Sequence, residues 1–153
     1  MIDDLREKHH RHSVNKKPYY DYYQFLPHRS YSRYTADDIN WYIEHYLGFT
    51  TKDQGKPYAS LLYQSGQSFT DAQHTYGTNA IMMLSLAMNE SDFGRSTIAW
   101  EKKNLFGHAA YDASPSSSSS AYNSVRDSIF AHAKRYLHES YLNPCLLYTS
   151  RCV

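Results

Sequence analysis

The chain has 153 residues, a length that fits one domain whose core is large enough to fold without disulfides. Its hydrophobic fraction of 41% and charged fraction of 20% are those of ordinary globular proteins, so the composition favours neither a disordered chain nor a membrane protein. A net charge of +1 gives no electrostatic reason to expect nucleic acid as the main partner.

Residues 1–34 are predicted to form an irregular, basic, Tyr-rich lead-in. Pro18 and Pro27 bracket the Tyr-rich run and disfavour a long helix there. The histidines in residues 9–12 suggest a metal site, but neighbouring side chains in a solvated arm point apart, so we expect no metal and no cofactor. The sequence shows no run long and apolar enough to span a membrane, and its first residues lack the apolar core of an export signal.

The next segments have helical patterns. A first helix is predicted to begin after Thr35 as N-cap and to end at Gly48. A second is predicted over residues 70–76, closed by Gly77. Residues 80–88, after Asn79 as N-cap, are apolar almost all round, which is typical of a helix buried in the centre of a domain. The apolar stripe of the first helix consists of Ile39, Tyr42, Ile43, Tyr46 and Leu47.

The second half of the chain contains less regular patterns. Residues 104–108 have the composition of a small hairpin or extended lobe, and the serine-rich residues 114–120 are predicted to be an exposed loop. A last helix is predicted to begin after Ser124 as N-cap and to stop before Pro144. The sequence therefore predicts a mainly α domain with a small, partly β or irregular lobe.

One carboxylate, Glu90, comes directly after the apolar helix. Burial against apolar walls disfavours the charged form of a carboxyl group, so a Glu in this position is suited to hold a proton and deliver it near neutral pH. A glycosidic oxygen needs such a general acid when its bond is cleaved. The alternative interpretation is a helix-end residue that faces solvent.

Three other acids are weaker candidates for a second carboxylate. Asp92 and Glu101 are close to Glu90 in the sequence, but the pattern favours solvated surface acids. Asp112 stands before the serine-rich loop, where a lobe can close over a substrate, and its alternative is a turn residue whose side chain bonds its own backbone. The sixteen Tyr residues, which combine a ring with a hydroxyl, suit polar ring-shaped ligands such as sugars, or simply a Tyr-rich core and surface.

Residues 87–99 read Ala-Met-Asn-Glu-Ser-Asp-Phe-Gly-Arg-Ser-Thr-Ile-Ala, and residues 103–107 read Lys-Asn-Leu-Phe-Gly. This pair of motifs closely resembles the glucosaminidase domain of bacterial autolysins, glycoside hydrolase family 73. Residues 110–112 and 121–128 are also similar to the autolysin subgroup, so the resemblance covers roughly residues 19–144.

The resemblance implies a lysozyme-like helical fold and an enzyme that cleaves peptidoglycan glycan strands after N-acetylglucosamine. It makes Glu90 the catalytic acid, and it leaves open the second catalytic group, because the acetamido oxygen of the substrate acts as nucleophile in related chemistry. A lytic transglycosylase with the same fold and a single acid, and a glycan-binding module without turnover, are the alternatives. The residues expected to shape or contact the substrate groove are Asn104, Leu105, Phe106, Gly107, Tyr111, Asp112 and Tyr122.

The resemblance also suggests how the chain is divided. Residues 35–144 are expected to be the catalytic domain, cut short at its C-terminal end. Residues 145–153, which hold both cysteines, have no counterpart in the family and are expected to be a non-native tail. The parent protein is expected to act in the cell wall or outside the cell.

Overall fold

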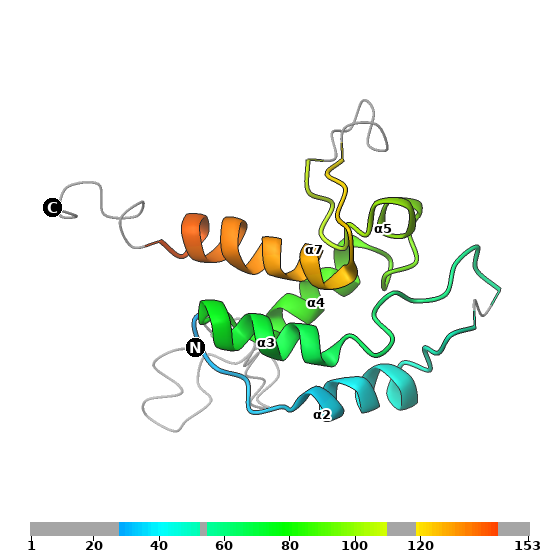
Figure 1. Cartoon of the computed structure of the whole chain (residues 1–153). Coiled ribbons are helices and arrows are strands. Elements are labelled where there is room, and N and C mark those ends of the chain that lie inside the picture. Colours follow the sequence, from blue (N-terminus) through cyan, green and yellow to red (C-terminus); the bar gives the residue numbers. More distant parts are fainter. Residues whose placement is uncertain (1–27, 53–54, 110–118, 144–153) are drawn as a thin grey trace, which may run out of the picture.

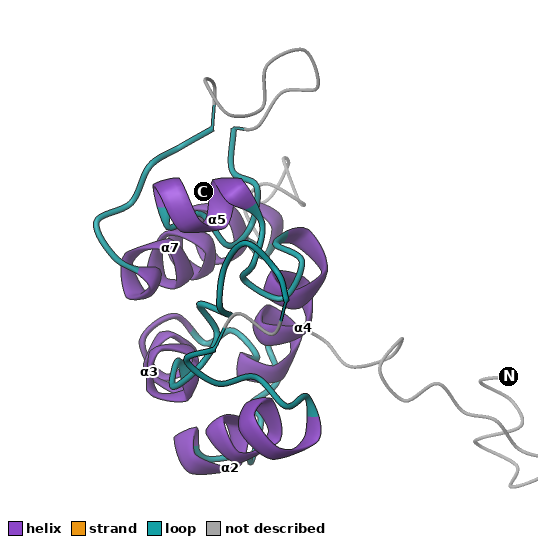
Figure 2. Ribbon diagram, turned by 90° about the vertical axis from the view of Figure 1, so that its right-hand side faces the viewer, coloured by secondary structure: helices purple, strands orange, loops and turns teal. Residues whose placement is uncertain are grey.

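The computed structural model describes residues 28–52, 55–109 and 119–143, and these residues form a bundle of helices with no strand among them (Figures 1 and 2). The mainly α prediction is confirmed. The small lobe, expected to be partly β or irregular, is irregular in its described part: residues 103–109 and 119–124 form turns and irregular backbone. The helices are α2 (Ala36–Trp41), the π-helix η2 (Tyr42–Tyr46), α3 (Gly66–Tyr76), α4 (Ala80–Glu90), α5 (Thr97–Lys102), α7 (Val125–Ala131) and the π-helix η3 (His132–Tyr141).

Helix α3 is the element against which the others pack. It contacts α2, α4, α7 and η3, and α2 continues directly into η2 as α7 does into η3 (Figure 1). Apolar side chains from these helices meet in one core, and their burial is the main source of stability in a domain of this kind. The core side chains that are fully removed from solvent include Ile43, Leu62, Phe69, Ala72, Met83, Ala87, Leu105, Ile129 and Ala133.

The predicted helix ends are confirmed where a side chain caps the helix. Thr35 forms a reciprocal capping box with Asp38 before α2. The Asn79 side chain accepts hydrogen bonds from the backbone of the first turn of α4, and Ser124 does the same for α7. Gly77 ends α3 in the left-handed conformation, with φ of 65°.

The predicted start of α3 at residue 70 is wrong, because the helix begins at Gly66. Glycine is a poor helix former, so the sequence pattern did not extend this far. Glycine is needed at this position because of a contact between two helices. The Gly66 N–H donates to Asn40 Oδ1 at 2.8 Å, and this brings the start of α3 against α2. A Cβ at residue 66 would overlap the carbonyl oxygen of Ala36 and lie 2.7 Å from Asn40 Oδ1.

Helix α4 is buried on one side only. Ala80, Met83, Leu84 and Ala87 are buried in the core, whereas Ser85 is exposed and its apolar neighbours on the same side are half-buried. The expectation of a helix surrounded by core on all sides is therefore only half right.

The segment before α2 is held to the junction between α3 and α4 by two buried amide side chains. Gln73 accepts from the backbone N–H groups of Ser32 and Ala80 and donates to the Ser32 carbonyl. Asn79 donates from its side chain to the Ser30 hydroxyl at 2.9 Å and from its backbone to the His28 carbonyl. The end of the predicted lead-in is thus part of the folded domain.

Replacing Gly66 by Ala is expected to destabilise the fold by about 1–3 kcal/mol, because the added methyl group meets backbone that cannot move without separating α2 from α3. Urea unfolding followed by circular dichroism measures this. Thr75→Ala, at an exposed position of the same helix, is the matched control and should change stability by less than about 1 kcal/mol. Equal stability of Gly66→Ala and the wild-type chain would contradict the close packing.

Candidate active site

Glu90 is the last residue of α4, and the next six residues reverse the chain into α5. Ser91 is fully buried, and its hydroxyl donates to the Ala87 carbonyl while it accepts from the Gly94 N–H at 2.7 Å. The Ser91 carbonyl accepts from the backbone of Arg95 and Ser96. The Ser96 side chain then caps α5 by accepting from the Ala99 N–H. Each serine of the motif therefore makes the hydrogen bonds that form this corner.

Gly94 fits the corner against a distant segment of the chain. Its φ is 74°, and a Cβ there would lie 2.9 Å from the backbone nitrogen of Leu61. The Gly94 carbonyl accepts from that same Leu61 N–H at 3.1 Å. A side chain would both strain this backbone conformation and push the two segments apart, so the motif requires glycine here.

The expected burial of Glu90 against apolar walls is wrong, because Glu90 is exposed. Its carboxylate accepts a hydrogen bond from the Asn89 side-chain amide at 3.3 Å. Asp92 and Glu101 are also exposed, as predicted. Asp92 lies 3.8 Å from the exposed Lys56, an ion pair whose attraction is weak in water, and 3.8 Å from Arg95, whose side chain is largely buried. Glu90 is thus an accessible carboxylate on a rigid corner.

The loop after α5 is organised by the buried side chain of Asn104. Its amide nitrogen donates to the carbonyl oxygens of His108 and Ser120, and its Oδ1 accepts from the backbone of Phe106 and His108. These four hydrogen bonds of the Asn104 side chain close the loop over 104–108 and join it to the irregular segment at residue 120. Loss of any of these in a buried position is costly, so an Asn is required here.

Leu105 and Phe106 anchor this loop in the core. Leu105 is fully buried, and its N–H donates to the Ser128 hydroxyl of α7 at 3.1 Å. Phe106 is 7% exposed and stacks on His132, with ring centroids 3.9 Å apart. Gly107 is half-buried, with φ of 60°. The side chains of Asn104, Leu105 and Phe106 thus fix the shape of the loop and have little surface left for a ligand.

Tyr122, which was predicted to line one wall of the substrate groove, is half-buried beside this loop. Its hydroxyl lies 2.6 Å from His108 Nδ1, and its N–H donates to the Lys102 carbonyl at the end of α5. Tyr111 and Asp112, which were also predicted to shape or contact the substrate groove, lie outside the described part of the chain. The structure therefore brings Tyr122 into contact with His108, the residue after Gly107, and with the end of α5.

Two buried histidines behind Tyr122 were missed by the sequence analysis. His108 Nε2 lies 3.1 Å from His132 Nδ1, and the two residues are 5% and 6% exposed. Burial, together with nearby Arg135, lowers the pKa of His108 to about 4. Burial, together with His108 and His28, lowers the pKa of His132 to about 3. The sequence did indicate that His132 is buried, because it falls within the apolar stripe of the last helix, three residues after Ile129.

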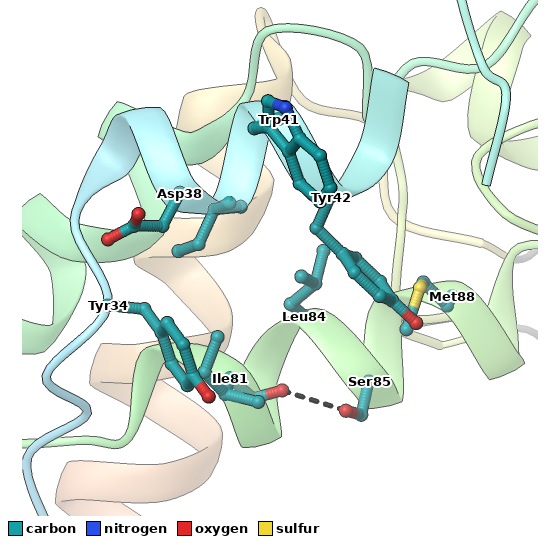
Figure 3. Close-up of a pocket in the computed structure, with 9 residues that line it drawn as sticks. Tyr34, Asp38, Trp41, Tyr42, Ile81, Leu84, Ser85 and Met88 are labelled. Carbon is teal, nitrogen blue, oxygen red and sulfur yellow. Dashed lines mark hydrogen bonds between the residues drawn. The ribbon is translucent and has the colours of Figure 1, made fainter. Parts of the chain in front are cut away.

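A pocket of about 510 Å³ lies elsewhere, between α2–η2 and α4 (Figure 3). The rings of Tyr34, Trp41 and Tyr42 stand over a floor that α4 supplies. Glu90 follows the floor residue Ile81 by nine positions, which is about two and a half helical turns, so the two side chains leave opposite sides of α4. The pocket is therefore not the place where Glu90 meets a substrate. Its remaining lining residues are Asp38, Ile39, Ile81, Leu84, Ser85 and Met88.

Within the described residues, no three His, Cys, Asp or Glu side chains are grouped in a way that could hold a metal ion. In the same part of the chain, none of the helices has the length and apolar character needed to cross a membrane.

The buried histidines predict a stability that falls in acid. Their pKa values in the folded chain are about 4 and 3, below the ordinary value of 6.5, so the unfolded chain binds more protons once the pH drops below about 6.5. The free energy of unfolding should then fall by roughly 1.4 kcal/mol per pH unit for each histidine, down to about pH 4. Urea unfolding between pH 7.5 and 4.5 measures the slope. His132→Phe, which keeps a ring beside Phe106, should reduce the slope, and an unchanged slope would refute the assignment.

The position of the pocket leads to a separate prediction. Trp41→Ala removes an exposed ring from the pocket, on the opposite side of α4 from Glu90. The cell-wall hydrolysis that the sequence motifs lead us to expect should change by less than about twofold, since surface substitutions away from the site have small effects. A reducing-sugar assay measures it, with thermal unfolding as the control for folding. A tenfold loss with intact folding would place the pocket in the substrate path.

Comparison with known proteins shows what this arrangement is similar to. Two relatives from Streptococcus pneumoniae, one of them from serotype 4, bear the name "Putative endo-beta-N-acetylglucosaminidase" and are each 37% identical to this chain over 84 residues. The match covers 55% of this chain but only 13% and 12% of the relatives, so the chain spans about an eighth of their length.

A crystal structure of a catalytic mutant of autolysin E from S. aureus, in complex with the disaccharide NAG-NAM, has the same fold. The TM-score is 0.57 at 22% identity, and the superposition covers 82% of this chain and 55% of that one. The glucosaminidase family model, described as mannosyl-glycoprotein endo-beta-N-acetylglucosaminidase, matches residues 66–150, which include Glu90, its corner and the loop of Asn104. Since this match covers more than half of the 153 residues, the chain belongs to the glucosaminidase family.

Proposed function

We propose that this chain is a peptidoglycan hydrolase that cleaves glycan strands after N-acetylglucosamine, with Glu90 as the general acid. The observation that carries the proposal is the accessible carboxylate of Glu90 at the end of α4, fixed by the hydrogen-bonded corner of Ser91 and Gly94. Membership of the glucosaminidase family supports the reaction class. The disaccharide NAG-NAM held by autolysin E supports peptidoglycan as the substrate.

The chemistry requires Glu90 to donate a proton to the departing glycosidic oxygen. Exposure in the free protein leaves the carboxyl group of Glu90 open to a glycan strand. The second catalytic group is either a carboxylate, with Asp112 as the candidate from the sequence, or the acetamido oxygen of the substrate itself. A rigid corner suits this role, because a general acid must be within hydrogen-bond reach of the oxygen that it protonates.

The wall of the substrate groove is proposed to contain Tyr122 and Gly107, with Tyr111 and Asp112 from the neighbouring segment. The buried side chains of Asn104, Leu105 and Phe106 support this wall from behind. We propose residues 35–144 as the catalytic domain and the bacterial cell wall, outside the cell, as its place of action.

Glu90→Gln is expected to lower turnover of purified peptidoglycan by at least 100-fold and to leave binding nearly unchanged. Glutamine keeps the size and much of the hydrogen bonding of glutamate but has no proton to give to the leaving oxygen, and general acid catalysis contributes about 100-fold to 10,000-fold. A reducing-sugar assay measures turnover, and co-sedimentation with insoluble cell walls measures binding.

Glu101→Gln is the matched control, since Glu101 is an exposed glutamate on α5, and its turnover should equal that of the wild-type chain. If Glu90→Gln keeps more than about a tenth of wild-type turnover, the acid assignment fails and a glycan-binding module is the better description. Mass analysis of the fragments separates hydrolysis from lytic transglycosylation, because the hydrolytic product is heavier by one water than the 1,6-anhydro product.

A further inference from the structure

A chain of hydrogen-bonding groups runs from Tyr122 into the core. The Tyr122 hydroxyl lies 2.6 Å from His108 Nδ1, and His108 Nε2 lies 3.1 Å from His132 Nδ1. The three residues come from different parts of the fold: His108 from the loop after α5, Tyr122 from the segment before α7, and His132 from η3. These two contacts therefore link the loop after α5, Tyr122 and the last helix.

Aromatic stacking fixes both imidazole rings. The His108 ring lies 3.9 Å from the Tyr136 ring with an angle of 6° between their planes. The His132 ring lies 3.9 Å from the Phe106 ring with an angle of 3°. Rings that are stacked this closely and buried cannot turn without opening the core. The ring nitrogens thus have fixed directions.

The fixed nitrogens leave two ways to place the hydrogens, because two neutral rings share one hydrogen across their contact. In the first, Tyr122 donates to His108, His108 donates to His132, and His132 Nε2–H is buried without an acceptor among the described residues. In the second, His132 Nδ1–H donates to His108 Nε2, and His108 Nδ1–H donates to the Tyr122 oxygen. This second arrangement leaves only a lone pair unsatisfied at His132 Nε2, and buried N–H groups without a partner are the rarer and costlier defect.

The second arrangement also has a consequence for Tyr122. The Ser120 side chain also hydrogen-bonds the Tyr122 hydroxyl, in the sense that lowers the pKa of the phenol, so it donates to the phenol oxygen. With His108 and Ser120 both donating to that oxygen, the O–H of Tyr122 is left for another acceptor. We propose that His108 and His132 are positioning residues for Tyr122, which hold the phenol oxygen as an acceptor and leave its hydrogen for an oxygen atom of the bound glycan. This inference rests on the proposed function, in which Tyr122 belongs to the substrate wall.

The charged and titratable groups around the pair agree with neutral imidazoles. Arg135 lies near enough to lower the pKa of His108, and His28 does the same for His132. The Tyr136 ring stacks on the His108 ring. Burial is the main factor that opposes protonation of both rings, and the positive charge of Arg135 adds to it at His108, as His108 and His28 do at His132. The network should remain intact down to about pH 5, so the positioning of Tyr122 should not vary over the range from pH 5 to 8.

A double-mutant cycle tests the proposal. Tyr122→Phe removes the hydroxyl, and His108→Phe keeps the stacked ring but removes the hydrogen bond to Tyr122. Each change should lower kcat/KM by about threefold to tenfold, the effect of one hydrogen bond, and the double variant should be no worse than Tyr122→Phe alone. Losses that multiply would show that His108 does not act through Tyr122 and would overturn the proposal. His138→Phe, at an exposed histidine of η3, is the control and should match the wild-type chain.

The same cycle is measured on binding to insoluble peptidoglycan in the Glu90→Gln background. If the wild-type chain does not hydrolyse peptidoglycan, the proposed function fails, whereas the binding cycle still decides whether His108 acts through Tyr122. Thermal unfolding of each variant identifies any that fails to fold, and for such a variant His108→Gln replaces His108→Phe.

Nitrogen-15 NMR of the imidazole rings tests the hydrogen placement without any substrate. At pH 6 the expected result is two neutral rings that both carry hydrogen on Nδ1, with the His108 signals shifted in Tyr122→Phe. Hydrogen on Nε2 of His108 would mean that Tyr122 donates inward, and would overturn the proposal.

Discussion

The corner between α4 and α5 is the constraint on which the arrangement of the site depends. Helix α4, which is buried on one side, ends at a carboxylate that is open to solvent, and the chain then reverses direction at once to form the neighbouring loop. The Ser91 hydroxyl makes this possible, because it satisfies backbone groups at the end of α4 and in the turn without any water. Gly94 lets the turn touch the backbone of Leu61. Any movement of this corner would move Glu90.

The loop after the corner is stabilised by buried polar side chains in place of paired strands. Asn104 closes the loop, the Ser128 hydroxyl holds Leu105, and His108 joins Tyr122 to η3. Each buried polar group has a strong preference for one geometry, because leaving it unpaired costs about 1–3 kcal/mol. A loop built in this way is specific in shape although it has no regular secondary structure. That property suits the proposed substrate wall, which must keep a constant position relative to Glu90, the proposed acid.

The two sides of α4 have different surroundings, and this separates Glu90 from the apolar pocket between α2–η2 and α4. Ile81, Leu84 and Met88 form the floor of the pocket below Trp41 and Tyr42 (Figure 3). Glu90, by its helical spacing from Ile81, leaves α4 on the other side. An apolar pocket is the ordinary first choice for a ligand site. The proposed glycosidase chemistry requires a carboxylate, and Glu90, the proposed acid, does not line the pocket.

The sequence by itself determined the features that depend on neighbouring residues. Thr35, Asn79 and Ser124 cap helices through hydrogen bonds within three residues, so their roles were readable from local order. The motif around Glu90 and Asn104 likewise identified the family from residues close in the chain. Only the tertiary structure decided the exposure of Glu90, the start of α3 at Gly66 and the contact of His108 with His132. These depend on segments that are distant in the sequence, and the free energy of such contacts is set by packing and burial, which local patterns do not contain.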